Sequence, residues 1–327
     1  MTARVGIPSS LLYYMHYPMW HTFLTELNLD VVPSGQTNKN FLDQGVKEAL
    51  ADACVPVKLF FGHTLTLRDK VDYLFIPRVV CLNQKTIYCP KFLGLPDMIR
   101  YGLPDMPPII DIQMDVREGR MALFRAYNQI GSSFGAGSLQ IARAYLKALY
   151  SAARYNALMQ KGWHPPEAIK AVLNPNSKDI APTARKGDLN FAVLGYPYVV
   201  HDDYISVGLI GKLKKLGVNV ITLENLPPAT LARQNCDLDK IMFWTYSDLV
   251  LRASHYLFKS GQVDGIIHLT AFGCGPDSMV DKLMELTAKE YSNIPYMSLT
   301  IDEHSGDAGV STRLEAFTDM VKRKKEV

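Results

Sequence analysis

Gly265-Ile-Ile-His-Leu-Thr-Ala-Phe-Gly-Cys-Gly-Pro-Asp-Ser278 is the stretch that decides the fold. Seven mostly apolar residues of strand length, Gly265–Ala271, run into a loop of glycine, cysteine and proline. A helical segment follows the proline. Short apolar strands that alternate with helices are typical of a parallel sheet covered by helices on both faces. The stretch therefore predicts one strand–loop–helix unit of such a sheet.

The same alternation recurs along the chain and predicts two α/β halves. Strands are expected at 4–7, 30–33, 73–79, 190–194, 218–222, 265–271 and 296–301. Helices are expected at 11–27, 44–53, 56–65, 206–216 and 239–260. We therefore expect an N-terminal α/β domain over 1–112, a helical segment and linker over 113–184, and a C-terminal α/β domain over 185–327.

The central segment differs in composition from both halves. Pro104–Pro108 marks a break, and Phe124–Met159 is alanine-rich and predicted to be one helix. Its apolar face is expected to carry Ile141, Tyr145, Leu149 and Ala152. Pro165–Pro182 is rich in proline, asparagine and lysine, which predicts a linker.

Bulk composition fits a globular protein of two domains. The 327 residues are 48% hydrophobic and 20% charged, with a net charge of +3, so composition gives no support to a nucleic-acid partner. No apolar stretch approaches the ~20 residues of a membrane span, and no signal-peptide pattern opens the chain. We expect a cytoplasmic protein without a membrane partner. In that reducing compartment, cysteines are metal ligands, reactive thiols or core residues rather than disulfides.

Three of the five cysteines share one local pattern. Cys54, Cys89 and Cys274 each precede a proline by one or two residues, and a predicted helix follows each proline. Thiols at helix N-termini are expected to have a lowered pKa and to suit a negative cluster. Because ligands gather beyond the carboxyl ends of parallel strands, we expect the three to converge in a cleft between the domains. Three thiolates can hold three irons of a cubane and leave the fourth open to a substrate or a second cubane.

Other interpretations of these cysteines stay open. A lone buried cysteine is usually a small core residue, and zinc is a rival metal, although the close pairs of structural zinc sites are absent. Cys81 and Cys236 lack the pattern and are interpreted as structural or incidental. The sequence has neither a P-loop nor a dinucleotide-binding glycine fingerprint.

Several blocks, spread over nearly the whole chain, resemble the 2-hydroxyacyl-CoA dehydratase D-component superfamily, and most closely its acyl-CoA dehydratase activase-related branch. They are Gly6-Ile-Pro, Asp52-Ala-Cys-Val-Pro-Val-Lys58, Asp72-Tyr-Leu-Phe-Ile-Pro-Arg78, Tyr88-Cys-Pro-Lys-Phe-Leu-Gly-Leu-Pro-Asp97, Phe272-Gly-Cys-Gly-Pro-Asp-Ser278, Asp302-Glu-His-Ser-Gly-Asp-Ala-Gly309 and Thr312-Arg-Leu-Glu-Ala-Phe317. Benzoyl-CoA reductase subunits and double-cubane cluster proteins are relatives of this superfamily. The chain is shorter than substrate-binding dehydratase subunits, and no segment is identifiable as an acyl-CoA site.

The resemblance implies two flavodoxin-like domains, a dimeric assembly, homo- or heteromeric, and an oxygen-sensitive, anaerobic chemistry. It implies a [4Fe–4S] cluster, or a double-cubane [8Fe–9S] cluster, held by Cys54, Cys89 and Cys274. It also implies a separate ATP-dependent activator, with its own cluster, as the electron donor. The expected function is therefore a cluster protein that receives low-potential electrons to reduce or dehydrate a small or CoA-linked substrate. A dehydratase-like lyase and a double-cubane type reductase are the two enzyme classes this allows.

Two alternatives to that function remain. The chain could be a non-catalytic electron-transfer or activation partner of a related dehydratase or reductase, or a thiol protein without metal. Candidate catalytic residues are Asp302, Glu303 and His304, which follow a predicted strand and carry acid–base groups. Structural roles in a turn are the alternative for them.

Several polar and aromatic residues have a structural and a functional interpretation. Asp277 and Ser278 are expected as helix caps, and Ser278 also as a hydrogen-bond donor to a cluster sulfur. Arg313 and Glu315 are expected to begin the last helix. Lys58, Arg78 and Lys91 could offset cluster charge, with salt bridges as the alternative. The aromatic first helix is attributed to core packing or to a dimer face.

Overall fold

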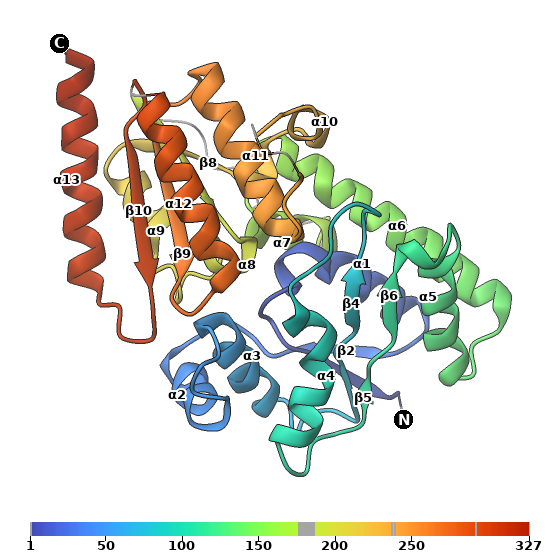
Figure 1. Cartoon of the computed structure of the whole chain (residues 1–327). Helices are drawn as coiled ribbons and strands as arrows, with labels where there is room; N and C mark the ends of the chain where they lie inside the picture. Colours follow the sequence, from blue (N-terminus) through green and yellow to red (C-terminus); the bar gives the residue numbers. More distant parts are fainter. Residues whose placement is uncertain (1, 176–186, 237, 239, 292, 327) are drawn as a thin grey trace. The chain divides into compact units, whose positions relative to one another are not determined.

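The computed structural model describes residues 2–175, 187–236, 238, 240–291 and 293–326 (Figure 1). The described residues form two compact units. Unit 1 comprises those within Met1–Ala53, Val57–Ala157 and Ala168–Ser177. Unit 2 comprises those within Cys54–Pro56, Leu158–Glu167 and Lys178–Val327. The sequence-based division at 112 and 184 stays a prediction.

Unit 1 is built on a four-stranded parallel sheet of order β2-β1-β3-β5. The strands are β1 (Arg4–Ile7), β2 (Asp30–Pro33), β3 (Tyr73–Phe75) and β5 (Ile109–Ile110). A small parallel sheet of β4 (Arg78–Cys81) and β6 (Gln113–Asp115) continues β3 and β5. The single strand expected at 73–79 is thus two strands, because Pro77 between them has no N–H to donate to a ladder.

Helices of unit 1 follow the strands in the predicted alternation. They are α1 (Tyr13–Glu26), α2 (Lys39–Glu48), α3 (Val55–Leu65), α4 (Pro90–Gly102), the short η1 (Val116–Glu118) and α5 (Ala122–Ser133). The helix expected at 44–53 begins five residues earlier, where the Asn38 side chain accepts hydrogen bonds from the N–H groups of Asn40 and Phe41.

The central helical segment is corrected in two places. The expected helix over 124–159 is divided into α5 and α6 (Ser138–Gln160) by a turn in which Gly135 has a φ of +76°. The expected linker at 165–182 begins instead with helix α7 (Pro165–Leu173), whose prolines occupy the first turn and need no donor there. Residues 176–182 of that prediction lie outside the described residues.

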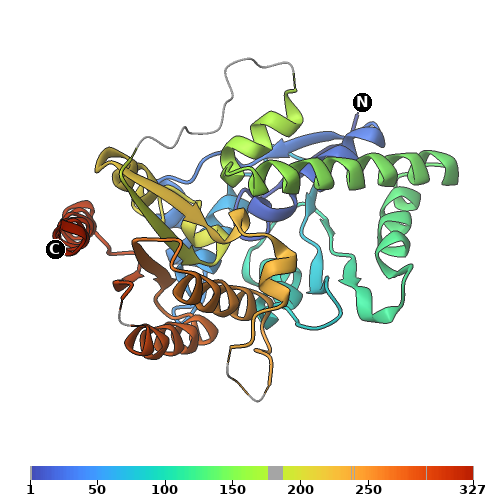
Figure 2. The ribbon, with the colours of Figure 1, turned by 90° about the horizontal axis from the view of Figure 1, so that it is seen from above.

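Unit 2 holds a second four-stranded parallel sheet, of order β10-β9-β7-β8, with helices on both faces (Figure 2). Its strands are β7 (Leu189–Gly195), β8 (Val218–Thr222), β9 (Gly265–Ala271) and β10 (Tyr296–Ile301). Every residue of β9 is buried, as expected of an inner strand in a sheet covered on both sides.

Helices of unit 2 occupy the connections between these strands. They are α8 (Pro197–Val200), α9 (Leu209–Lys215), η2 (Leu223–Asn225), α10 (Pro228–Ala232), α11 (Thr245–Ser260), α12 (Gly275–Glu290) and α13 (Asp307–Glu326). Helix α9 begins three residues later than expected, because Val207 and Gly208 both have positive φ. Helix α11 likewise begins at Thr245 rather than at 239.

The α/β class and the parallel sheets are therefore confirmed. In each unit the first strand lies between the second and the third, an order shared with doubly wound sheets. Among the described residues, no helix combines the length and the apolar composition that crossing a bilayer requires.

Helices α2 and α3 approach each other through two glycines. A Cβ on Gly45 would lie 1.8 Å from the backbone oxygen of Lys58, and a Cβ on Gly62 would lie 1.8 Å from that of Phe41. Since backbone atoms cannot rotate away, only glycine allows this crossing. The crossing positions α3, the helix that follows Cys54.

We predict that Gly45→Ala and Gly62→Ala each lower the free energy of unfolding by about 2–4 kcal/mol, since the overlap exceeds any gain in helix propensity. Gly94→Ala is the matched control, because its helical position has open space around it and should gain up to ~1 kcal/mol. Urea unfolding checks all three. Equal stabilities for the Gly45 and Gly94 variants would contradict the close crossing.

Candidate functional site

The carboxyl edge of the unit 2 sheet gathers three loops. Strand β9 leads through Phe272 and Gly273 to Cys274, and neighbouring β10 leads to Asp302. The Phe272 N–H donates to the carbonyl of Ile301 at 2.8 Å, which joins these two loops directly. Strand β7, on the other side of β9, leads to Tyr196 and α8. The edge is the place where open α/β sheets bind ligands.

Cys274 is the N-cap residue of α12, as the sequence predicts. Pro276 occupies the first turn, and Gly273 takes a φ of +79° that lets the chain turn sharply before the helix. The N–H groups of the first turn of this 16-residue helix are aligned with the helix dipole. A thiolate here would lie at the electropositive end of the helix.

Cys54 lies against this loop although it is distant in sequence. It directly precedes α3 and belongs to unit 2 together with Val55 and Pro56. A Cβ built on Gly273 would be 3.5 Å from the Cα and 3.9 Å from the Cβ of Cys54. The structure therefore brings together two of the three predicted cysteines, each half-buried at a helix N-terminus.

A buried aromatic cluster adjoins these two cysteines. The rings of Tyr196, Tyr198 and Tyr246 lie 5.6–5.8 Å apart in all three pairs. The pKa of Tyr198 is held well above its ordinary value, mainly by burial. The negative charges of Cys274, Tyr196 and Cys54, in that order, raise it further. Tyr198 therefore stays a neutral phenol within electrostatic range of both sulfurs.

Cys89 belongs to unit 1, where it is the N-cap residue of α4 with Pro90 next to it. Burial raises the pKa of its thiol, and the backbone N–H and charge of Lys91 offset only part of that effect. The lowered pKa that we expected at this helix N-terminus is thus wrong for Cys89, because desolvation of the thiolate outweighs the helix. Loading a metal there would release a proton and become easier as pH rises.

The donor chemistry of these cysteines fits an iron–sulfur cluster, since each is half-buried at the start of a helix. Within the described ranges, no three or more histidine, cysteine or carboxylate side chains form a group able to hold a metal ion. A three-thiolate site of Cys54, Cys89 and Cys274 therefore stays a prediction. Cys81 is buried, and its Sγ donates to the carbonyl of Thr86 at 3.2 Å, consistent with a structural role.

The three candidate acid–base residues lie in the turn after β10. The Asp302 carboxylate accepts hydrogen bonds from the Ser305 hydroxyl at 2.8 Å and the His304 N–H at 3.0 Å. These bonds hold the pKa of Asp302 below its ordinary value, so it is a carboxylate that shapes the turn. Glu303 is half-buried and His304 exposed. Catalytic roles for the three stay predictions.

The residues expected to cap or begin the last two helices have other positions or partners in the structure. Ser278 donates its hydroxyl to the carbonyl of Cys274 at 2.9 Å, and a bond from it to a cluster sulfur stays a prediction. Asp277 is not a cap but is fully buried in the first turn of α12. Arg313 and Glu315 do not begin α13, which starts at Asp307 because the loop after β10 is shorter than expected.

Of the three basic residues near the cysteines, Arg78 has a structural role. Its guanidinium forms ion pairs with Asp97 at 2.5 Å and Asp111 at 2.8 Å, and Arg100 bridges the same two carboxylates. This network ties α4, and so the position of Cys89, to the segment after β5. Salt bridging, the alternative interpretation, therefore describes Arg78.

A buried network that sequence reasoning missed positions α12. His268, at the centre of β9 and fully buried, lies 3.2 Å from the Asp277 carboxylate and 2.8 Å from that of Asp281. Burial alone would lower the pKa of His268, but the two carboxylates raise it to about 9. A buried imidazolium thus joins the strand before Cys274 to the helix after it. A lone histidine in an apolar strand was the only available signal.

A second missed network anchors the turn between α6 and α7 to unit 2. His201 Nε2 lies 2.8 Å from Glu224 Oε2, and both side chains are almost fully buried. The ring of His164 lies 5.8 Å from that of His201, and burial, with the charges of His201 and Lys214, lowers its pKa to about 3. The Asn225 amide donates to two carbonyls of the turn.

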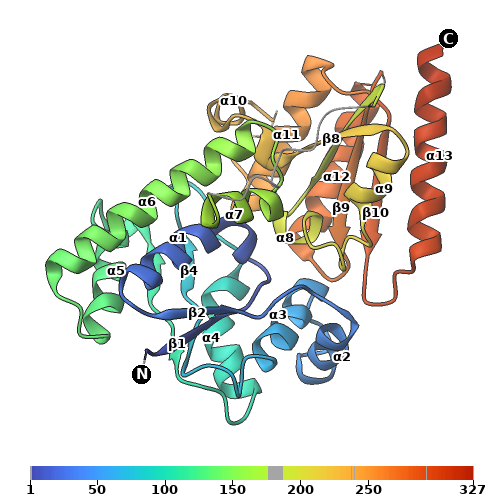
Figure 3. The ribbon, with the colours of Figure 1, turned by 180° about the vertical axis from the view of Figure 1, so that it is seen from behind.

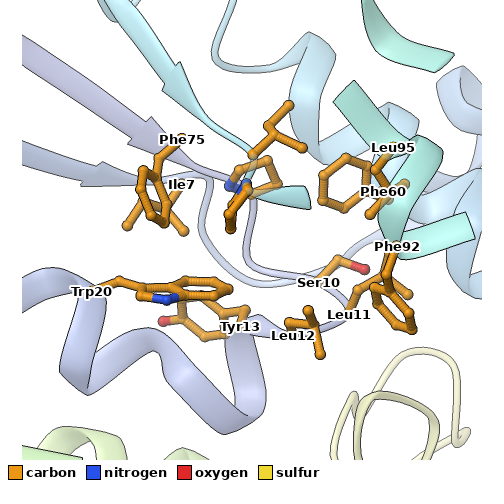
Figure 4. Close-up of a pocket in the computed structure, with 13 residues that line it drawn as sticks. Ile7, Ser10, Leu11, Leu12, Tyr13, Trp20, Phe60, Phe75, Phe92 and Leu95 are labelled. Carbon is orange, nitrogen blue, oxygen red and sulfur yellow. The ribbon is translucent and has the colours of Figure 1, made fainter. Parts of the chain in front are cut away.

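Unit 1 carries an apolar pocket at the carboxyl ends of β1 and β3, where the strand order reverses (Figure 4). The space inside it is about 20 Å³, roughly the room that one water molecule needs. Trp20 from α1 and Phe75 from β3 contact each other edge to face on one side, with ring centroids 5.3 Å apart, and Phe92 and Leu95 of α4 close another side. Phe92 is one helical turn from Cys89, and its N–H donates to the Cys89 carbonyl.

Two family profiles match the chain. Residues 4–226 match the CoA enzyme activase uncharacterised domain, and residues 198–321 match the D-component of 2-hydroxyglutaryl-CoA dehydratase. The first match contains Cys54 and Cys89, and the second contains Cys274. No curated protein matches the chain.

Solved structures give only distant likeness. A glucosamine-6-phosphate deaminase from Thermotoga maritima is 12% identical, with a TM-score of 0.22 over 99% of this chain and 85% of that one. A candidate phosphosugar isomerase from Silicibacter pomeroyi DSS-3 is 8% identical, with a TM-score of 0.22 over 99% and 86%. These values carry no argument about function.

We predict that His268 stabilises unit 2 in a pH-dependent way. Its pKa rises from 6.5 to about 9 on folding, so its contribution is complete below 6.5 and is lost as pH rises through about 9. His268→Gln should cost about 3–5 kcal/mol at pH 6, because it leaves the buried Asp277 and the partly exposed Asp281 without their cation. The difference from the wild type should shrink towards pH 10.

Urea unfolding at several pH values checks this prediction. His304→Gln is the matched control, because His304 is exposed and should change stability little at any pH. A difference between wild type and His268→Gln that stays constant from pH 6 to pH 10 would show that the buried histidine is neutral.

Proposed function

The chain belongs to the CoA enzyme activase uncharacterised domain family, and from this premise we propose that it binds an iron–sulfur cluster through Cys54, Cys89 and Cys274. The proposed cluster receives low-potential electrons from an ATP-dependent activator and passes them to a small or CoA-linked substrate. The match of residues 198–321 to a dehydratase component supports a role in a dehydratase-like system.

One observation carries this proposal. Cys54 and the Gly273–Cys274 loop are distant in sequence, yet the structure packs them against each other with both cysteines at helix N-termini. A structural cysteine needs only a hydrophobic cavity and gains nothing from a second thiol or a helix dipole. Paired half-buried thiols at converging helix ends are what ligation of a negative cluster requires.

The residues around the cysteines have distinct parts in the proposed site. The first turns of α3, α4 and α12 stabilise the negative charge of the thiolates and sulfides. Tyr198, which stays protonated, is buried within electrostatic range of Cys54 and Cys274 and adds no negative charge beside their thiolates. A [4Fe–4S] or double-cubane cluster, when bound, would supply single electrons at low potential.

We also propose that both units have a flavodoxin-like fold. The strand order of each unit, with the first strand between the second and third, supports two flavodoxin-like sheets. A dimeric assembly and a cluster in a cleft between domains are proposed from the family resemblance.

For the cluster, we predict that anaerobic reconstitution loads about four irons and four sulfides per chain for one cubane, or about eight irons for a double cubane. Cys54→Ser, Cys89→Ser and Cys274→Ser should each lose most of the iron and the EPR signal of the reduced protein. Cys81→Ser and Cys236→Ser are matched controls and should load normally. Stable zinc in place of iron, or full loading of all three Ser variants, would refute the proposal.

The description of the matching domain favours a second function, that of a non-catalytic activation or electron-transfer partner. This function predicts the same cluster but no turnover of thioesters when reduced activator is supplied. An open iron, needed for turnover, would shift the EPR signal when cyanide or a thioester is added. The two functions therefore differ in these readouts while sharing the iron content.

A further inference from the structure

Helix α6 is apolar on two opposite faces. Its inner face, which packs on α1 in unit 1 (Figure 3), carries buried Ile141, Ala144, Ala148 and Tyr155. The hydroxyl of Tyr155 donates to the carbonyl of Tyr14, and that of Ser151 to the carbonyl of Pro18. The face expected from sequence is therefore wrong at Leu149, which points outward because the true inner stripe is offset by one residue.

The outer face carries large apolar side chains where a surface helix normally has charges. Leu139 is 85% exposed, Leu146 66% and Tyr150 72%, and Leu149 is also exposed. With Ala142 and Ala153, the leucines form a seam spaced three and four residues apart, the pattern of a coiled-coil face. The exposed patch is on the order of several hundred Å², a size that marks interaction sites.

Charge on α6 is one-sided. The helix contains Arg143, Lys147 and Arg154 and no acidic residue between Ser138 and Gln160. At ~100° per residue, the three basic side chains lie on the same flank of the seam, and the other flank is uncharged. Lys147 pairs with Glu26 in unit 1, and in the described part of the chain no carboxylate pairs with Arg143 or Arg154.

We propose that the outer face of α6 docks an amphipathic helix of another protein, one with a leucine-type seam and an acidic flank. A second copy of this chain fits less well, because α6 contains no carboxylate. Two antiparallel α6 helices would place their basic flanks together, and two parallel ones would set each basic flank against an uncharged flank. The narrow 3–4 spaced seam and the single basic flank match a helix with a defined orientation better than a lipid surface. The inference is independent of the proposed cluster.

The test uses the full chain and two synthetic 21-residue helical peptides with leucine seams, one flanked by glutamates and one by lysines. Fluorescence anisotropy at moderate salt measures binding. The glutamate peptide should bind at least tenfold more tightly, and this preference should weaken as salt rises. Arg143→Glu combined with Arg154→Glu should reverse the preference, and Leu146→Asp should abolish binding of either peptide. Leu50→Asp, exposed elsewhere in unit 1, should bind like the wild type.

Circular dichroism confirms that each variant is folded before binding is compared. Equal binding of the two peptides, no binding, or no reversal by the double arginine variant would overturn the proposal. Two further results would also overturn it: dimerisation of the chain that Leu146→Asp abolishes, and binding to phosphatidylglycerol vesicles but to neither peptide.

Discussion

The close contact between Gly273 and Cys54 is the constraint on which the proposed site depends. Gly273 adopts a left-handed conformation, which glycine tolerates best, and this turn brings the start of α12 beside the start of α3. Two thiols then lie at converging helix ends, where the charge of a thiolate is best tolerated. Without this approach, Cys54 and Cys274 would be two unrelated cysteines.

The rest of the structure supports that contact from several directions. The buried His268 network fixes the first turns of α12 to β9, and the α2–α3 glycine crossing fixes α3 against α2. Tyr198 lies close enough to both cysteines for their charges to raise its pKa. In unit 1, the Arg78 network holds α4, which carries both Cys89 and a wall of the apolar pocket. Each cysteine therefore lies on an element with its own independent anchor.

Sequence patterns predicted the parallel α/β class and most strands, because buried parallel strands are mostly apolar runs such as Gly265–Ala271. They also predicted the helix that follows each cysteine, since proline in the first turn is a local signal. They missed the α5–α6 break although Gly135 is a local turn signal, and they failed where tertiary packing decides: the outward leucines of α6 and the burial that raises the pKa of Cys89. The His268 and His201 networks were invisible because their partners are set by the fold.

We propose that Cys54, Cys89 and Cys274 bind the same iron–sulfur cluster. An anomalous difference map at the iron absorption edge, from crystals of anaerobically purified protein, tests this most directly. We expect a compact group of iron peaks within bonding distance of all three sulfur atoms. Iron bound by other side chains, or a map without iron in which Cys54 and Cys274 form a disulfide, would contradict it.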